Sequence, residues 1–270
     1  MDRKKGVPTK GVLRQSKTQS FTKQNRYFPK ESLKHFIEHY WSVTWDFPPN
    51  VCYTAETLPY PSVHIVFENG KDLVYGVHQK RFSVTLQGKG SVFGIKFLPG
   101  GFYPVYQKTM ASLTNGIFTL ESILNPSFLS QCDLNVAISK TDQDENRIQI
   151  IESWLESIQL NFDPKITLVN QIIDFIRKDI TITRVEQISK FFSIKLRSLQ
   201  RLFNEYVGVN PKWIIQQFRM QEIAERIEKE KLIHFADFSN EFGFFDQAHF
   251  NRMFKKMIGL SPEKYLKSLE

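Results

Sequence analysis

Two arginines, Arg201 and Arg252, occupy the same position in two copies of a short motif that repeats at an offset of 51 residues. Each copy has the form apolar-x-Arg-x-Phe, then four residues, then Gly-x-Asn-Pro or Gly-x-Ser-Pro. An amide side chain precedes each arginine, Gln200 in the first copy and Asn251 in the second. In the major groove of DNA, a guanidinium can pair with guanine through two hydrogen bonds, and an amide can pair with adenine in the same way. The repeat therefore suggests recognition of base edges, performed twice.

Two helices must present these groups, and the apolar spacing predicts them over 196–206 and 246–258. Each has an apolar face and an opposite polar face. The candidate contact residues of the first helix are Arg197, Ser198, Gln200, Arg201 and Asn204. Those of the second are Gln247, Ala248, Asn251, Arg252 and Lys255. Each helix is predicted to stop at a glycine, after which an N-capping Asn or Ser and a proline begin the next helix.

A charged helix face is simply solvated in most proteins, and for either helix alone that interpretation would be preferred. Two such faces at equivalent positions of a repeat indicate that both helices bind the same molecule. The distribution of charge along the chain supports a negatively charged partner. The net charge of +8 divides into +8 for residues 1–34, −5 for 35–163 and +5 for 164–270. Basic ends around an acidic middle are expected if the ends meet a polyanion. The lysines best placed for phosphates are Lys195, Lys212, Lys255 and Lys256.

A long helix is predicted to join the two units, from Asn210-Pro211 to about Lys229. At 1.5 Å per residue it would span roughly 27 Å. Adjacent major grooves lie roughly 34 Å apart on one side of the duplex. We therefore expect bent DNA, or partial engagement of one of the two helices.

Residues 164–270 resemble the DNA-binding domain of the AraC family of bacterial transcription factors. The resemblance rests on 197–203, 208–211, Arg219, 243–255 and 259–265. It implies two helix-turn-helix units, a double-stranded DNA operator as the partner, and contacts at positions 197, 200, 201, 247, 248, 251 and 252. RNA polymerase, a small-molecule effector and a second copy of the chain are further partners that the resemblance leaves open. No cofactor is implied.

Two residues depart from the family pattern. Lys195 stands where the family commonly has Ser, so the first recognition helix (196–206) is expected to begin at Ser193 instead. Ala248 has no hydrogen-bonding side chain and can contact only a thymine methyl group. The second recognition helix (246–258) should therefore depend mainly on Gln247, Asn251 and Arg252.

Residues 50–110 have the pattern of a compact β domain, either a sandwich or a small barrel. Strands are predicted at 63–68, 72–75, 82–86 and 92–97, and Asn69-Gly70 between the first two is a strong hairpin signal. Apolar residues at helical spacing predict a helix over 33–41. A weaker resemblance of residues 27–125 to the regulatory domain of some AraC-type proteins rests on Tyr40-Trp41, Pro59-Tyr60-Pro61 and 94–102. It implies a cupin-like sensor or a dimerisation domain.

The expected fold is thus α+β, with a small N-terminal β barrel or sandwich, flanking helices, and an all-α C-terminal domain. We expect a basic flexible arm over 1–26, a regulatory domain over 27–138, a linker with a dimerisation helix over 139–163, and the DNA-binding domain over 164–270. In the linker, the spacing of Ile148, Ile151, Leu155 and Ile158 predicts a narrow apolar seam. The seam fits a dimer contact and packing on its own β domain about equally well.

Other chemistry has weak support. His35 and His39 are four apart on the predicted helix, a metal-binding spacing, but no third ligand is evident. Two cysteines without a CxxC pair, no membrane-length apolar run and no signal peptide favour a cytoplasmic protein. Because no Ser/His/Asp arrangement is legible, we expect that the protein is not an enzyme. The rival interpretations are a DNA-targeted enzyme and a nucleoid-type protein that binds DNA without sequence preference. A regulator controlled only by its abundance stays open within the main interpretation.

Overall fold

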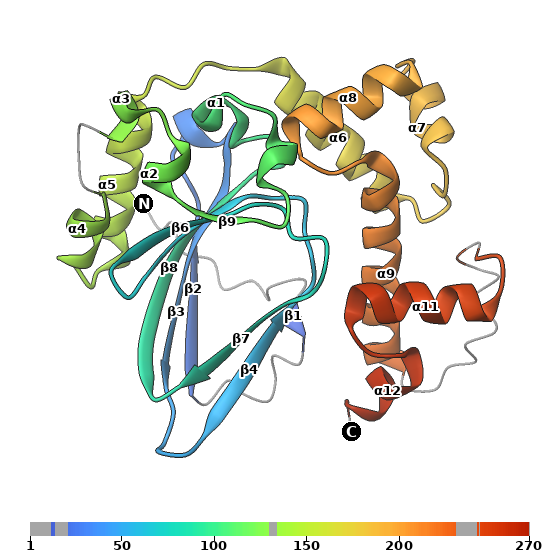
Figure 1. Ribbon diagram of the computed structural model, residues 1–270, viewed down its shortest axis with the longest axis horizontal. Helices are drawn as coiled ribbons and strands as arrows, with labels where there is room; N and C mark the ends of the chain where they lie inside the picture. The colour runs from blue at the N-terminus through green and yellow to red at the C-terminus, as the bar shows by residue number, and fades with distance from the viewer. Residues whose placement is uncertain (1–11, 14–20, 130–133, 231–241, 243, 270) are drawn as a thin grey trace.

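The chain forms a β domain and a helical domain that lie side by side. The computed structural model describes residues 12–13, 21–129, 134–230, 242 and 244–269. In Figure 1 the β domain and its helices lie on the left, the helical domain lies on the right, and the segment after α5 crosses between them. The expected α+β class is confirmed.

Two antiparallel sheets build the N-terminal domain. The larger one has the order β2-β3-β8-β5-β6-β9, with bounds Thr22–Tyr27, Ile37–Asp46, Lys89–Phe97, His64–Glu68, Lys71–Tyr75 and Ile117–Thr119. The smaller has the order β1-β4-β7, with bounds Val12–Leu13, Cys52–Thr57 and Phe82–Gln87. The predicted hairpin is confirmed, because Asn69 and Gly70 join β5 to β6 with φ of 51° and 70°. A tight hairpin with two left-handed residues matches the right-handed twist of its strands.

The predicted helix over 33–41 is wrong. A short 3-10 turn at Glu31–Leu33 is followed by β3, which pairs with β2 on one side and β8 on the other. Because β3 is a central strand covered on both faces, Tyr40 and Trp41 can both be apolar without forming a helical stripe. The sequence of β3 therefore lacks the alternation of apolar and polar residues that would have predicted a strand.

Short helices and α5 cover one face of the larger sheet (Figure 1). Their bounds are α1 Tyr103–Tyr106, η3 Met110–Leu113, α2 Leu120–Ile123, α3 Pro126–Leu129, α4 Leu134–Ser139 and α5 Asp144–Ser157. The first three residues of the predicted seam are buried against this sheet: Ile148, Ile151 and Leu155. Asp144 accepts hydrogen bonds from Tyr27 (3.0 Å) and Ser42 (2.6 Å). Of the two uses of the seam that the sequence left open, the structure shows packing on its own sheet.

The opposite face of the larger sheet meets the smaller one. Trp45, Phe47 and Leu86 form a small apolar cluster between them, which makes this end of the domain a sandwich. Farther along the same face, Lys96 lies 3.1 Å from Glu38 and 3.7 Å from the centre of the Tyr60 ring. His64 pairs in register with Lys96 and packs against Trp41.

The half-buried His64 should make the fold sensitive to acid. Burial, and secondly the nearby Lys96 charge, lower the pKa of His64 from 6.5 to about 3. The unfolded chain takes up a proton below pH 6.5, whereas the folded chain does not, so stability present above pH 6.5 is lost as the pH falls toward 3. We expect the free energy of unfolding to drop by up to about 2 kcal/mol between pH 7 and pH 5. Urea titrations of the wild type and His64→Phe would check this. An unchanged pH slope in the variant would contradict it.

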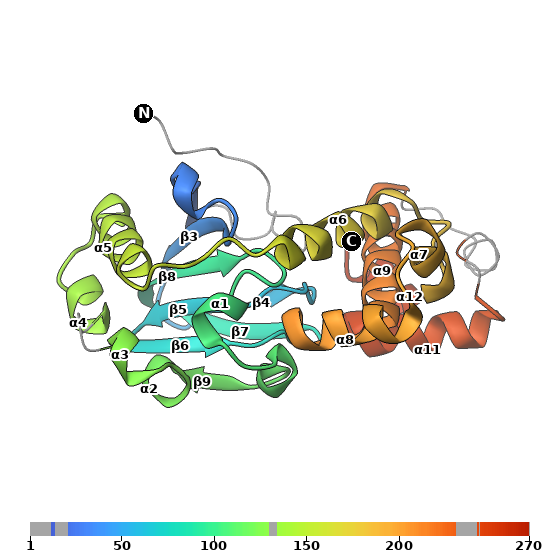
Figure 2. The same cartoon turned by 90° about the horizontal axis from the view of Figure 1, so that it is seen from above.

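The C-terminal domain is helical, as predicted (Figure 2). Its helices are α6 Pro164–Lys178, α7 Val185–Phe191, α8 Leu196–Tyr206, α9 Pro211–Glu230, α11 Gln247–Ile258 and α12 Pro262–Lys267. The boundaries follow local chemistry: Asp163 caps α6 through the amide of Lys165, and Asn210 caps α9 through the amide of Trp213. The sequence also predicts a short helix around 235–242, but apart from the buried Phe242 this segment lies outside the described residues.

Candidate nucleic-acid interface

The first recognition helix is α8, with the predicted bounds. It packs on α6 and α7 and buries Leu199, Phe203 and Tyr206. The expected start at Ser193 is wrong, since Ser193 lies in the turn with φ of 54° and Lys195 is the N-cap residue without a side-chain cap. A left-handed residue cannot begin an α-helix, so the turn ends before α8 starts.

All five candidate residues of α8 are exposed: Arg197, Ser198, Gln200, Arg201 and Asn204. Within the described part of the chain, none of their side chains forms a hydrogen bond or ion pair. A guanidinium or amide that has no partner in its own chain keeps all its donors for another molecule. The structure thus leaves a continuous polar face on α8.

The second recognition helix, α11, repeats this arrangement. The Asp246 side chain accepts a hydrogen bond from the amide of His249 at its start, and Gly259 ends it with φ of 88°. Its buried residues are Phe250, Phe254, Met257 and Ile258. The candidate residues Gln247, Ala248, Arg252 and Lys255 are exposed, and Asn251 is half-buried. The two polar faces that the repeat predicted are therefore both present on the surface.

The linker helix α9 holds the second unit through cation–π contacts. The Arg219 guanidinium lies 4.6 Å from the centre of the Phe244 ring, and that of Arg226 lies 5.2 Å from Phe242. Burial lowers the pKa of Arg219. At 1.5 Å per residue, the 20 residues of α9 span about 30 Å. This is close to, but below, the roughly 34 Å between adjacent major grooves.

Sequence reasoning missed a set of contacts between the β domain and the C-terminal end of α8. The Tyr103 ring stacks on Tyr206 with 4.1 Å between ring centres, and its hydroxyl donates to Glu205 at 3.0 Å. The Thr109 hydroxyl donates to the backbone carbonyl of Asn204 at 3.1 Å. These groups come from α1 and the loop before η3, and no local sequence signal pairs them with a helix about a hundred residues away.

His35 and His39 do not lie on a common helix. His35 lies in a turn, with its Nε2 3.0 Å from the carbonyl oxygen of Asp163, whereas His39 lies on β3 beside Glu38. Among the residues that the structure describes, no three His, Cys, Asp or Glu side chains are grouped to hold a metal. None of the described helices is long and apolar enough to cross a membrane.

Two protein families match this chain. Residues 25–119 match a family described as a domain of unknown function (DUF6597), and residues 188–268 match one described as a helix-turn-helix domain. The second match covers α8, α9 and α11, and with them both candidate faces. The first covers the larger sheet from β3 to β9.

Relatives with a similar segment are named as regulators. The Msm operon regulatory protein of Streptococcus mutans is 32% identical over 87 residues, which are 32% of this chain and 31% of that protein. An uncharacterised HTH-type transcriptional regulator of Haemophilus influenzae is 27% identical over 85 residues, covering 32% and 28%. The chain thus spans less than a third of each curated relative.

Among solved structures, ToxT from Vibrio cholerae is similar with a TM-score of 0.38 and 13% identity, over 92% of this chain and 98% of that one. The chain thus contains a helix-turn-helix domain over residues 188–268, and both recognition helices lie within it.

Proposed function

We propose that this protein is a sequence-specific DNA-binding transcriptional regulator whose two recognition helices enter adjacent major grooves. One observation carries the proposal: α8 and α11 each present an exposed polar face with an Arg next to an amide, and one helix of about 30 Å joins them. A duplex offers paired acceptors at guanine and a donor–acceptor pair at adenine at that spacing. Lys195 and Lys212 contact phosphates in this arrangement, which fixes the register without selecting a sequence.

The N-terminal domain supplies the regulation in this proposal. Its contacts with the end of α8 support this role, because a change in the β domain can reach the first recognition helix directly. The protein acts in the cytoplasm, without catalytic activity, and responds to a small molecule or to pairing with a second copy. RNA polymerase is the further partner through which a bound regulator would alter transcription.

Selection of binding sites from random duplex DNA would test the proposal. The full chain at fixed, near-physiological salt should enrich two short motifs about ten base pairs apart. A nucleoid-type protein would instead show a steep salt dependence without any enriched sequence. If the full chain enriches nothing, the selection is repeated with residues 164–270. Enrichment by that fragment would mean that the β domain restrains the recognition helices, and continued silence would contradict specific DNA binding.

A further inference from the structure

The second recognition helix begins beside an aromatic ring that the fold does not bury. Phe245 precedes the N-cap residue Asp246 of α11, and 93% of the phenylalanine is exposed. No other large apolar residue among those described is as exposed, and Phe162 follows at 69%. Within the described part of the chain, the Phe245 ring stacks on no aromatic side chain. Single exposed apolar residues are common on protein surfaces, so the position of this ring decides what it means.

The ring lies among the candidate contact residues of α11. Residues 245–248 are all exposed, and they include Gln247 and Ala248, which the sequence predicts at the DNA interface. In helix-turn-helix proteins, the N-terminal residues of the recognition helix contact the edges of the bases. Phe245 is therefore presented to the major groove together with these residues.

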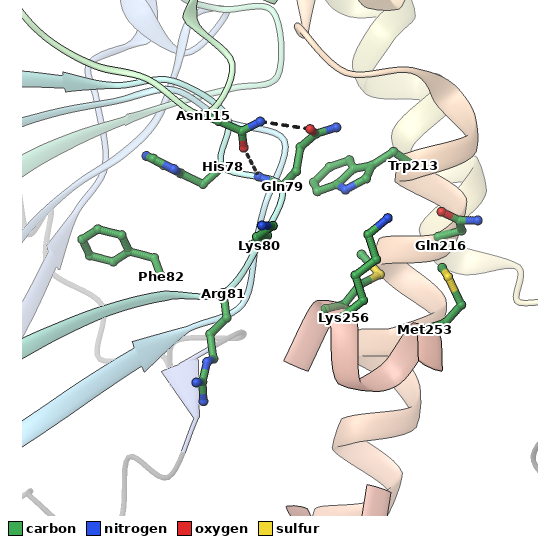
Figure 3. Close-up of a pocket in the computed structure, with 11 residues that line it drawn as sticks. His78, Gln79, Lys80, Arg81, Phe82, Asn115, Trp213, Gln216, Met253 and Lys256 are labelled. Carbon is green, nitrogen blue, oxygen red and sulfur yellow. Dashed lines mark hydrogen bonds between the residues drawn. The ribbon is translucent and has the colours of Figure 1, made fainter. Parts of the chain in front are cut away.

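The start of α11 lies away from the β domain. In Figure 1 both recognition helices begin on the right and end beside the β domain. At the end of α11, the guanidinium of Arg81 lies against Gly259. The lining residues that α11 contributes to a cavity shared with the β domain begin at Met253 and include Lys256 (Figure 3). The β domain thus lies against the later part of α11 and leaves its start accessible to a duplex.

The neighbouring groups favour base edges over phosphates as the surface that Phe245 contacts. A free helix N-terminus attracts phosphate, but the Asp246 carboxylate already accepts a hydrogen bond from the amide of His249 there. The negative charge of Asp246 also repels phosphates, and an apolar ring offers them no hydrogen bond. In the major groove, the apolar group is the C5-methyl of thymine, which Phe and Ala side chains can contact. The start of α11 therefore fits thymine.

The first unit of the repeat has no equivalent ring. At the offset of 51 residues, Phe245 corresponds to Ile194, and Ala248 corresponds to Arg197. Ile194 is partly buried and packs on the apolar core, whereas Arg197 is exposed and charged. An aromatic contact with a thymine methyl group is thus expected of α11 and not of α8.

We propose that Phe245 is a specificity-determining residue which, together with Ala248, contacts the C5-methyl groups of one or two thymines in the site bound by α11. Asn251 and Arg252 bind the hydrogen-bonding groups of neighbouring bases, and Phe245 adds a preference for an apolar group. This inference rests on the proposed DNA-binding function and extends it to a thymine preference at a defined end of the second recognition helix.

Replacement of thymine with deoxyuridine tests the proposal, because it removes only the C5-methyl group and keeps the base pair. Each thymine of the selected operator is replaced in turn, and the affinity of the full chain is measured by fluorescence anisotropy at fixed salt. Burial of one methyl group corresponds to roughly fourfold in affinity. One or two replacements should therefore weaken binding by the wild type roughly fourfold each.

The variant Phe245→Ala assigns the effect to the ring. It should bind the unmodified operator at least fourfold more weakly than the wild type. At one of the sensitive positions, replacement of thymine with deoxyuridine should no longer change its affinity, because the ring that covered the methyl group is gone. If Phe245→Ala keeps the wild-type response at every thymine, the inference is overturned, and the exposed ring is left for a protein partner.

The methyl group can also be supplied on another base. At the position where Phe245→Ala has lost its response, a C·G pair should weaken binding by the wild type. The same pair with 5-methylcytosine should restore affinity at least twofold relative to cytosine, and it should restore nothing in Phe245→Ala. Equal binding of the two cytosine duplexes by the wild type would overturn the methyl contact.

Phe162→Ala is the matched control. Phe162 is an exposed phenylalanine that precedes α6 and lies outside both recognition helices. This variant should keep the wild-type response to every deoxyuridine, and an equal loss in it would overturn the assignment to Phe245. Thermal unfolding of Phe245→Ala should match that of the wild type, because the ring buries little surface on folding.

Two kinds of failure are distinguishable. The absence of any selected operator would overturn the proposed function and this inference with it. A selected operator whose deoxyuridine profile is the same for the wild type and Phe245→Ala would overturn this inference alone.

Discussion

Replacing Arg201 and Arg252 together with alanine is expected to abolish specific operator binding without unfolding the protein. Each bidentate contact with a base contributes about 1–3 kcal/mol of discrimination. If the two losses add, affinity for the selected operator falls between roughly 30-fold and more than 10,000-fold. Both side chains are exposed and form no hydrogen bond or ion pair in the described part of the chain, so the thermal midpoint should stay within a few degrees. Fluorescence anisotropy with the operator and with a scrambled duplex measures the loss.

Arg177→Ala is the matched control for this double variant. Arg177 is an exposed arginine on α6 in the same domain, and its ion pair with Asp174 (2.7 Å) is of the kind that contributes about 0–1 kcal/mol. It should lower affinity for both duplexes slightly and equally. If the double variant keeps the wild-type preference for the operator, the recognition residues have been assigned incorrectly.

The helical domain was predictable because its helices are specified by residues close together in the sequence. The apolar spacing of Leu199, Phe203 and Tyr206 defines a helix within eleven residues, and the end signals at Gly208 and Asn210 fall at its boundary. The repeat then supplied an internal comparison, so the same pattern could be recognised twice. Local signals of this kind do not depend on what the rest of the chain does.

The β domain was less predictable because its pairings are not local. The strand Ile37–Asp46 is covered on both faces, and its partner Lys89–Phe97 lies about fifty residues away. Nothing in the local sequence around Tyr103 and Thr109 predicts that their hydroxyl groups donate hydrogen bonds to residues of α8. Lys256, for which the sequence predicts a phosphate contact, also lines a cavity of about 530 Å³ whose walls come from both domains. Such sites arise from how the two domains meet, which no single segment encodes.

The second large effect concerns the glycines that end the two recognition helices. Gly208 and Gly259 occupy equivalent places in the repeat and have φ of 91° and 88°. Alanine in a left-handed backbone costs roughly 1–2 kcal/mol, so both Gly→Ala variants share this cost. Their surroundings differ, which makes them a matched pair.

Gly208→Ala should be clearly the more damaging of the two. A Cβ at Gly208 would lie 2.7 Å from the backbone carbonyl oxygen of Met110 and from the Thr114 hydroxyl, which donates to the Gly208 carbonyl at 2.7 Å. The three atoms nearest to a Cβ at Gly259 would belong to the guanidinium of Arg81, at 2.7–2.9 Å, which is the far end of a flexible side chain. The first variant must therefore push η3 away from α8, whereas the second needs only a side-chain shift.

Thermal unfolding and amide hydrogen exchange would separate these effects. Gly259→Ala should lower the free energy of unfolding by roughly 1–2 kcal/mol and leave exchange at the end of α8 unchanged. Gly208→Ala should lower it further and speed exchange at both 204–209 and 110–114, because the two segments lose the same contact. If the two variants are equally destabilised and exchange is unchanged in both, η3 moves away from the new Cβ without lowering the free energy of unfolding. In that case the β domain does not anchor the first recognition helix, and regulation must reach the DNA-binding domain by another route.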